Sequence, residues 1–529
     1  MKKVLLSIVI LAAISLATAC SAGKVNDTTA KTETTTQPLQ VINSSTVTLV
    51  AKEEQQKLSN GVVVPVWTFN GSAPGPEIRV KKGETVKITL KNELSAPVSI
   101  HWHGYPVPNN MDGIPGVTQD AVAPGKSFTY EFVADKPGTY WYHSHQDSVN
   151  QLDRGLYGSL IVEDPAQTYD KDFTLMLDEW TTNKQIIDDQ IKTMTGSAKN
   201  DTNNSGSMNN NNMGGMNHSG MNMGTTNSKS SGGMNMMGDN MLSMYDLFTI
   251  NGKSGDLIKP LQVKQGDKVR VRLINAGYLS HYIHIHGHEI KVIATDGQPV
   301  NDPKVLKDQL LAIAPGERYD VEFVANNPGK WYIEDHSGSK QAEGMKALIE
   351  YEGSKDSTDK VNTNEQLPVL NIMNYGTKKE GSFTLNQKYD VTYSMDLNTV
   401  MNGNNMAYTI NGKSFPNTDP IQVKKGDFVK VKLKNNSMMN DHPMHLHGHY
   451  FQLLSKNGKP IEGSPIMKDT INLKPGEEYE VAFVADNPGE WMFHCHDLHH
   501  AAAGMVTELK YTDFQSSFKP DPTIGNMPE

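Results

Sequence analysis

A threefold internal repeat is the feature that most restricts how this chain can fold. One segment occurs as "WTFNGSAPGPEIRVKKGETVKITL" (67–90), "FTINGKSGDLIKPLQVKQGDKVRVRL" (248–273) and "YTINGKSFPNTDPIQVKKGDFVKVKL" (408–433). A second segment follows in each repeat, as "FVADKPGTYWYHSH", "FVANNPGKWYIEDH" and "FVADNPGEWMFHCH". Self-similarity of this kind indicates related domains in series. A chain of 529 residues is also too long for one compact core.

The repeats have the sequence pattern of β-structure. Polar and apolar residues alternate over short runs, and Asn-Gly and Pro-Gly turns separate these runs. Such spacing predicts an all-β protein made of antiparallel β-sandwiches. We expect three domains and a short tail, at 46–165, 166–355, 356–515 and 516–529.

The N-terminus indicates export. "MKKVLLSIVILAAISLATAC" has two lysines, an apolar stretch and small residues before Cys20, as a bacterial lipoprotein signal peptide does. We expect residues 1–20 to be this signal peptide, Cys20 to be lipidated, and 21–45 to be a flexible tether. The protein is then extracytoplasmic and anchored to the membrane; an ordinary secretory peptide cleaved nearby is the alternative. A net charge of -10 provides no basic face for nucleic acid.

A segment of low complexity interrupts the second repeat. Residues 196–244 consist largely of Asn, Gly, Ser and Met, including ten methionines and His218 between positions 208 and 244. Apart from the methionines, nothing in this insert could form a core, so we expect disorder in the absence of a ligand.

The only cysteine besides Cys20 lies in "HCHDLHHAAAGM" (494–505). Side chains alternate along a strand, so Cys495 faces away from His494 and His496. In "HPMHLHGH" (442–449), His442 similarly faces away from the next two histidines. Two imidazoles, a thiolate and a weak thioether form the ligand set of a blue, electron-transferring copper. The residues predicted to converge are His442, Cys495, His500 and Met505.

Four His-x-His pairs occupy the opposite side. They are His101/His103, His143/His145, His445/His447 and His494/His496. Eight neutral imidazoles with no carboxylate among them suit copper, and they are about the right number for three ions. Half come from the first repeat and half from the third, which predicts a cluster at the interface of those domains. A chance pairing of structural histidines would not explain four pairs beside a Cys-His-Met set.

These motifs resemble those of three-domain multicopper oxidases, of the bacterial laccase and cuprous oxidase kind. The similarity spans roughly residues 45–515 through "HWHG", "WYHSH", "HPMHLHGH" and "HCHDLHHAAAGM". It implies cupredoxin-like Greek-key domains and four copper ions. Type 1 copper would bind His442, Cys495, His500 and Met505, and type 2 copper His101 and His445. The type 3 pair would bind His103, His143 and His496, and His145, His447 and His494.

The resemblance also implies a mechanism. A reductant gives single electrons to type 1 copper, Cys495 passes them to His494 and His496, and dioxygen becomes water at the cluster. Asp112 in "NNMDGIPG" matches a proton-relay position, although it could simply form an Asp-Gly turn. Related bacterial enzymes often have a carboxylate where Ala501 stands. The second half of the proton path therefore differs here, and Asp497 or water could take the place of that carboxylate.

The middle repeat has lost the blue-copper ligands. It keeps His281 and Met345, but Asp335 replaces the cysteine and Lys340 the second histidine. We therefore expect no type 1 copper there and interpret this domain as a spacer. Its remaining histidines either form hydrogen bonds in a decayed site or hold an accessory copper or zinc. They are His284, His286, His288 and His336.

The reducing substrate is the open question. Thioethers prefer Cu(I), and the methionine-rich insert therefore favours a cuprous oxidase that supports copper tolerance. Further candidate delivery residues are Met395, Asp396, Met401, Met406, Met438, Met439 and Asp441. A laccase acting on phenols and aromatic amines is the alternative, and Mn(II) or Fe(II) remain open. Copper nitrite reductase and a copper-sequestering protein are less favoured, because neither needs the complete histidine set.

Overall fold

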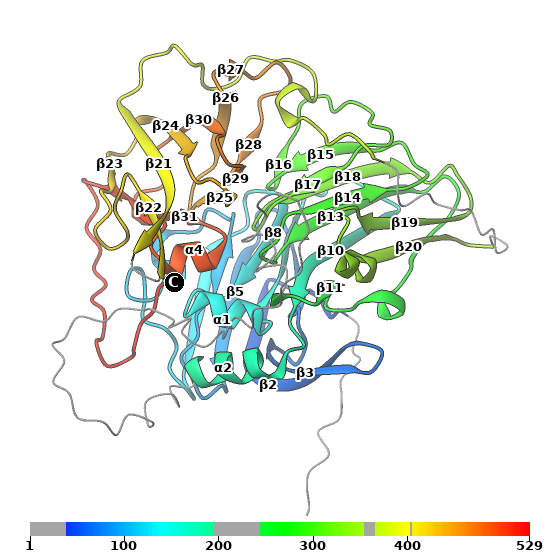
Figure 1. Cartoon of the computed structure of the whole chain (residues 1–529), viewed down its shortest axis with the longest axis horizontal. Coiled ribbons are helices and arrows are strands. Elements are labelled where there is room, and N and C mark those ends of the chain that lie inside the picture. Colours follow the sequence, from blue (N-terminus) through cyan, green and yellow to red (C-terminus); the bar gives the residue numbers. More distant parts are fainter. Residues whose placement is uncertain (1–38, 195–243, 354–365, 403–404) are drawn as a thin grey trace, which may run out of the picture. The chain divides into compact units, whose positions relative to one another are not determined.

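The computed structural model describes residues 39–194, 244–353, 366–402 and 405–529 (Figure 1). The signal peptide, Cys20, most of the expected tether and nearly all of the methionine-rich insert lie outside these residues. The predicted all-β class is confirmed, because strands make up nearly all the regular structure and gather into six sheets. The sheets occur as three successive pairs along the chain.

The first pair of sheets contains most of the first repeat. One sheet has the order β3 (Val62–Phe69), β2 (Thr46–Ser59), β5 (Thr85–Asn92) and β7 (Ser127–Val133). The other has the order β1 (Val41–Asn43), β4 (Glu77–Lys81), β9 (Tyr157–Glu163), β8 (Gly138–His143) and β6 (His101–His103). Since β1 pairs with β4, the expected tether ends before Val41 instead of reaching residue 45.

The second pair follows the same plan. One sheet has the order β11 (Leu247–Ile250), β10 (Lys171–Trp180), β13 (Lys268–Asn275), β18 (Arg318–Val324), β15 (Lys291–Thr295) and β16 (Gln298–Pro299). The other has the order β12 (Leu261–Val263), β20 (Lys346–Tyr351), β19 (Lys330–Asp335), β14 (His281–Ile285) and β17 (Leu311–Ile313).

The third pair contains the cysteine. One sheet has the order β22 (Asn405–Ile410), β21 (Val391–Asn402), β24 (Phe428–Asn435), β30 (Glu478–Val484), β26 (Phe451–Lys456) and β27 (Lys459–Pro460), with β28 (Met467–Lys468) also paired to β26. The other has the order β23 (Ile421–Val423), β32 (Val506–Tyr511), β31 (Glu490–Cys495), β25 (His442–Leu446) and β29 (Thr470–Leu473).

The expectation of antiparallel sheets holds for most strand pairs but not for all of them. In each pair of sheets, a long strand runs parallel to its neighbour: β2 to β5, β10 to β13, and β21 to β24. Alternation of side chains predicts which face of a strand is buried, but it carries no information on strand direction. The predicted Asn-Gly turns are present, with Asn70, Asn251 and Asn411 all in the left-handed conformation.

Strand β24 shows how the sequence positions these sheets. Val429, Val431 and Leu433 are buried, while Lys432 between them is exposed, as the alternation predicts. Strand β13 differs, because Arg270 and Arg272 are buried too. Their guanidinium groups pair with Asp320 and Asp172, with Arg272 Nε 2.7 Å from Asp172 Oδ1. Burial of these charges is compensated by ion pairs.

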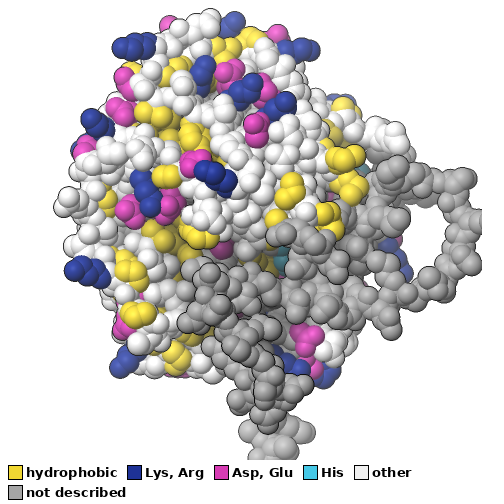
Figure 2. Space-filling model, turned by 60° about the vertical axis from the view of Figure 1, so that its left-hand side comes forward, with side chains coloured by type: hydrophobic (Ala, Val, Ile, Leu, Met, Phe, Trp, Pro, Cys, Tyr) yellow, Lys and Arg dark blue, Asp and Glu magenta, His cyan; other side chains and the backbone are white. Residues whose placement is uncertain are grey.

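Helices are few and short. They include α1 (Ser148–Asp153), α2 (Lys184–Met194) and α4 (Leu498–Ala502). Among the described residues, we find no helix with the length and apolarity needed to cross a membrane. On the face drawn in Figure 2, basic and acidic side chains are interspersed and separated by hydrophobic ones.

Candidate metal centre

Two pairs of strands position the histidines of the first and third repeats. In the first repeat, His101 on β6 lies directly opposite His143 on β8. In the third, His445 on β25 lies directly opposite His494 on β31. Directly opposite residues of neighbouring strands point to the same face of the sheet. The second histidine of each His-x-His pair then lies on that face as well.

The eight histidines converge into three groups, two of which share His103. In each group, the candidate ligand atoms lie within 4.8 Å of one another, and every member is buried. The groups are His101, His103 and His445; His103, His143 and His496; and His145, His447 and His494. Every group combines histidines of the first and third repeats, as the predicted interface cluster requires.

Rings from the two repeats pack face to face. His101 stacks on His447 with ring centroids 3.9 Å apart, and His103 stacks on His445 at 3.8 Å. Burial and the neighbouring imidazoles lower the pKa of His145 to about 3, with burial the larger cause. The same causes lower the pKa of His447 well below its usual range. These side chains are therefore neutral imidazoles, the form that binds metals.

Most of these rings have a buried nitrogen without a hydrogen-bond partner among the described residues. The atoms are His101 Nε2, His103 Nδ1, His143 Nε2, His145 Nε2, His445 Nε2, and both Nδ1 and Nε2 of His496. A buried polar atom without a partner is costly, so such a concentration calls for an explanation. Metal ions bound by these nitrogens would provide it.

Cys495 lies in a separate group on the other face of β31. Its sulfur is 3.8 Å from His442 Nδ1 and 3.5 Å from His500 Nδ1, and these two nitrogens are 3.2 Å apart. All three residues are buried. Met505 is also fully buried, and its carbonyl oxygen accepts a hydrogen bond from the Cys495 N–H. The structure therefore brings the predicted thiol and the two predicted imidazoles together, with Met505 next to them through its backbone.

Other side chains hold the two imidazoles of the cysteine group. Ser437 Oγ lies 2.7 Å from His442 Nε2, and Asp497 Oδ2 lies 3.2 Å from His500 Nε2. Tyr408 stacks on His500 with ring centroids 4.0 Å apart. Partners on the far nitrogen fix the orientation of a metal-binding imidazole. Asp497, a candidate for the second proton path, thus contacts the cysteine group.

Asp112 connects the two repeats directly. Its Oδ1 lies 3.1 Å from His101 Nδ1, and its Oδ2 lies 3.0 Å from His447 Nδ1. The side chain is 1% exposed. Asp112 therefore does more than form a turn, because its carboxylate orients one histidine of each repeat.

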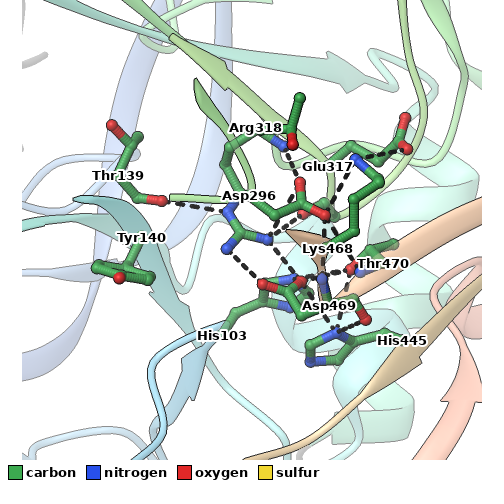
Figure 3. A network of polar contacts seen from close by, with 12 residues as sticks. His103, Thr139, Tyr140, Asp296, Glu317, Arg318, His445, Lys468, Asp469 and Thr470 are labelled. Atoms are coloured by element: carbon green, nitrogen blue, oxygen red, sulfur yellow. Dashed lines mark hydrogen bonds and ion pairs between the residues drawn. The ribbon is translucent and has the colours of Figure 1, made fainter. Parts of the chain in front are cut away.

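A second buried carboxylate, which the sequence analysis missed, lies beside the cluster (Figure 3). Asp469 Oδ1 is 3.4 Å from His103 Nε2 and 3.3 Å from His445 Nδ1. Burial by itself would raise the pKa of Asp469, but Arg318 and His445 lower it. The adjacent Thr470 Oγ1 lies 3.0 Å from His445 Nδ1. Thr470 lies directly opposite His445 on the neighbouring strand, a pairing that no pattern in the sequence indicates.

The middle repeat supplies the partner of this carboxylate. The two terminal nitrogens of Arg318 lie 2.7 and 2.6 Å from the two oxygens of Asp469. Gly316 also approaches the cluster, because a Cβ there would lie 3.0 Å from atoms of both His103 and His496. The expectation that this domain is only a spacer is therefore incomplete, since it forms one wall of the cluster.

A third carboxylate comes from the segment that we expected to be only a tail. Glu529 Oε1 lies 3.4 Å from His494 Nδ1, and the Pro528 carbonyl contacts His145 Nδ1. Burial is the main cause that raises the pKa of Glu529 to about 8, while Ser148 Oγ donates to its other oxygen at 3.1 Å. No motif in the sequence indicates this contact. The His-x-His motifs themselves contain no carboxylate. The structure nevertheless places three carboxylates beside these imidazoles.

The blue-copper position of the middle repeat contains an ion triad. His281 Nε2 lies 2.5 Å from Glu179 Oε1, and its Nδ1 lies 3.0 Å from Asp335 Oδ2. Asp335 faces Ile283 across the strands as Cys495 faces Met444, and its N–H bonds to the Met345 carbonyl. The replacement read from the sequence is therefore confirmed. Lys340 lies in a short 3-10 helix (Lys340–Gly344) rather than in this triad.

The candidate Cu(I) delivery residues differ in exposure. Met401, Met438 and Met439 are exposed by 67%, 89% and 45%. Met406 is partly buried, and Met395 is completely buried in the core, where its thioether cannot meet an incoming ion. Of the two carboxylates, Asp396 is exposed, and Asp441 is partly buried and accepts a hydrogen bond from Asn472.

Comparisons with known proteins agree with this geometry. Models of the multicopper oxidase family match residues 50–167, 171–354 and 389–515. The multicopper oxidase MmcO of Mycobacterium tuberculosis is 32% identical over 465 residues, which cover 85% of this chain and 84% of that protein. A copper resistance protein A homolog of Pseudomonas syringae pv. tomato is 24% identical over 543 residues, covering 86% and 91%. Relatives called laccases also match.

A solved structure is similar along nearly the whole length. The multi-copper oxidase from Pseudomonas thermotolerans is 25% identical and superimposes with a TM-score of 0.62. The match covers 90% of this chain and all of that one.

Proposed function

Since this chain belongs to the multicopper oxidase family, we propose that it oxidises Cu(I) and reduces dioxygen to water in copper tolerance. The observation that carries the oxidase assignment is the arrangement of β31. One short strand presents Cys495 to a two-histidine group on one face and His494 to a histidine cluster on the other. Because Cys495 and His494 are adjacent in the chain, only a few covalent bonds separate the two groups.

The residues fit four copper ions. A soft thiolate with two imidazoles suits a blue copper, and neutral imidazoles with free nitrogens suit the other three. We assign type 1 copper to His442, Cys495, His500 and Met505, and type 2 copper to His101 and His445. We assign the type 3 pair to His103, His143 and His496, and to His145, His447 and His494. His103 also adjoins the type 2 group, where its ring stacks on His445.

Copper ions held by these residues would supply one-electron redox chemistry, so that four electrons from the reductant and four protons could convert dioxygen to two waters. The protein contributes orientation and proton positions. Asp112 holds one histidine from each repeat, and we propose that its carboxylate also passes protons toward the cluster. Ala501 has no group that can carry a proton. Glu529 Oε1 lies 3.4 Å from His494 Nδ1 of the cluster, whereas Asp497 contacts His500 of the cysteine group.

The methionines favour Cu(I) as the reducing substrate. Met438, Met439 and Met401 offer exposed thioethers, and Met438, Met439 and Asp441 directly precede His442 in the chain. Cu(I) prefers such soft, neutral ligands. A relative called a copper resistance protein supports the same substrate. Met395 drops out of the proposed route because it is buried.

We also propose that the protein acts outside the cytoplasm, attached to the membrane through a lipid on Cys20. This proposal rests on the N-terminal sequence. Dioxygen is the second substrate. Phenols and aromatic amines are the alternative reductants, because relatives called laccases match the chain as well. Mn(II) and Fe(II) complete the set to be tested.

Steady-state oxygen uptake with Cu(I), a phenol, Fe(II) and Mn(II) in parallel tests the substrate. We expect Cu(I) to give the highest kcat/KM. Replacing the ten methionines between 208 and 244 by serine should lower the rate at low Cu(I) more than the rate with a phenol. Met439→Leu combined with Asp441→Asn should have the same effect on these two rates and should leave the blue colour unchanged. Replacing asparagines of the insert by serine is the control. Unchanged Cu(I) kinetics in both methionine variants would favour the laccase assignment.

A further inference from the structure

A fourth histidine group lies in the middle repeat, separate from the sites described above. It is formed at the pair of strands β14 and β19, which corresponds to β25 and β31 of the third repeat. By position in the repeat, His284 and His286 correspond to His445 and His447, and His336 corresponds to His496. Glu334 occupies the position of His494 and lies directly opposite His284. Three imidazoles and a carboxylate thus remain where the third repeat has four imidazoles.

The four side chains converge on one point. The ligand atoms of His284, His286 and His336 lie within 4.8 Å of one another. His286 Nε2 is 3.2 Å from His336 Nε2 and 2.8 Å from Glu334 Oε1. Glu334 Oε1 is also 3.6 Å from His336 Nε2. Nitrogens that face one another at such a distance can share one proton at most, whereas a metal ion can satisfy all of them.

Ordinary hydrogen bonding does not account for His284. His284 Nδ1 is buried and has no hydrogen-bond partner among the described residues. The neighbouring His288 is different, because its Nε2 lies 2.6 Å from Tyr351 Oη and its Nδ1 2.9 Å from the His286 carbonyl. His449 of the third repeat has the same two kinds of contact, with Tyr511 and with the His447 carbonyl. The last histidine of the motif is therefore structural in both repeats.

The surroundings support this group. Lys346 Nζ lies 2.6 Å from Glu334 Oε2 and so holds the other oxygen toward the histidines. A partner of this kind orients a ligating carboxylate. Asp308, whose side chain is 57% exposed, has an oxygen 3.9 Å from His284 Nε2. The side chains of His284, His286 and His336 are 6%, 9% and 5% exposed. Asp308 is therefore the exposed residue beside an otherwise buried group.

We propose that His284, His286, His336 and Glu334 form a fifth metal site, which binds Cu(II) through three nitrogens and one oxygen. Imidazole and carboxylate ligands suit divalent ions, and Cu(II) binds such a set more tightly than Zn(II) does. No thiolate or thioether belongs to this group, so Cu(I) is disfavoured. The site has no direct route for electrons through a Cys-His connection, and it stores or senses Cu(II) rather than reducing dioxygen. It does not depend on which reductant the oxidase uses.

Metal content of the full-length protein tests the site. After loading with Cu(II) and gel filtration, we expect five coppers per chain in the parent and four in His336→Gln and in His284→Ala. Both side chains are buried, so circular dichroism and the blue absorption of each variant check that it folds. His288→Gln is the matched control and should keep five. Because every variant retains the methionine-rich insert, copper bound there cancels in the comparison.

Spectroscopy distinguishes this site from the oxidase centres. The fifth ion should add one Cu(II) spin to the EPR spectrum of the parent, and His336→Gln should lose that spin with its blue absorption unchanged. Equal copper content in the parent and His336→Gln would overturn the proposal. So would the binding of one Zn(II) that excess Cu(II) fails to displace. Loss of the blue colour in all variants would instead mean that the oxidase assignment is wrong or that the variants misfold.

Discussion

Arg318 of the middle repeat and Asp469 of the third repeat form a two-pronged ion pair, with both side chains completely buried. The pair adjoins His103 and His445, which come from the first and third repeats. Asp296 joins the same network, with its Oδ2 3.1 Å from Lys468 Nζ and 3.2 Å from the Thr470 N–H (Figure 3). All three repeats therefore meet at one set of charges.

Removing the guanidinium should weaken copper binding by the histidines beside Asp469. Arg318→Met leaves Asp469 buried without its partner, and breaking a buried pair in this way costs about 3–5 kcal/mol. Loss of such an orienting group lowers metal affinity by roughly 10–100-fold. We expect lower type 2 copper content by metal analysis and EPR, with the blue absorption retained. Arg318→Lys keeps the charge but can no longer contact both oxygens of Asp469 with two nitrogens, so its copper content should be intermediate. Full copper content in Arg318→Met would contradict this role.

Cys495→Ser should abolish the blue absorption. A hydroxyl cannot supply the soft, covalent bond that a thiolate forms with copper. The histidine cluster should remain largely loaded, since Cys495 faces away from it. Visible absorption and copper content check the two effects together, and a blue Cys495→Ser protein would refute the type 1 assignment.

Substitutions in two different repeats should have the same effect. His103 and His447 lie in the first and third repeats and in different groups of one cluster. His103→Ala and His447→Ala should both keep the blue colour and lose oxygen reduction by at least about two orders of magnitude, as expected when an essential catalytic group is removed. Oxygen uptake measures this loss. Near-normal turnover in either variant would remove that residue from the cluster.

The ion triad of the middle repeat should make stability depend on pH. Burial alone would lower the pKa of His281, but Glu179 and Asp335 raise it to about 10. Because the folded pKa exceeds the ordinary value of about 6.5, the protonated triad stabilises the fold fully below that pH. This stabilisation declines as the pH rises toward 10, by at most about 1.4 kcal/mol per pH unit.

Chemical unfolding between pH 6 and 9.5 checks this trend. The difference in unfolding free energy between the parent and His281→Gln should be largest at pH 6 and should narrow as the pH rises. His288→Gln is the control, because its imidazole contacts Tyr351 instead of carboxylates. A constant difference across the range would show that His281 is not protonated in the folded protein.

The sequence predicted those parts of the site that depend on local pattern. Alternation along β31 placed Cys495 opposite to its flanking histidines, and repetition identified Asp335 as the residue in the cysteine position. Arg318, Asp469 and Glu529 were missed because their contacts join distant parts of the chain. Arg318 and Asp469 are 151 positions apart, and Glu529 is 381 positions from Ser148. No local spacing encodes such contacts. Strand direction was missed for a similar reason, since pairing partners are not neighbours in sequence.

The approach of Gly316 to His103 and His496 bears on how the enzyme can move. Because any Cβ at this position would press on both rings, the middle repeat touches the cluster with its bare backbone. A hinge that opened this contact would also have to pull Arg318 away from Asp469 without solvent to receive either charge. Opening the contact between the repeats is therefore costly, because it separates a buried ion pair. Exchange of dioxygen and water that left this contact closed would not carry that cost.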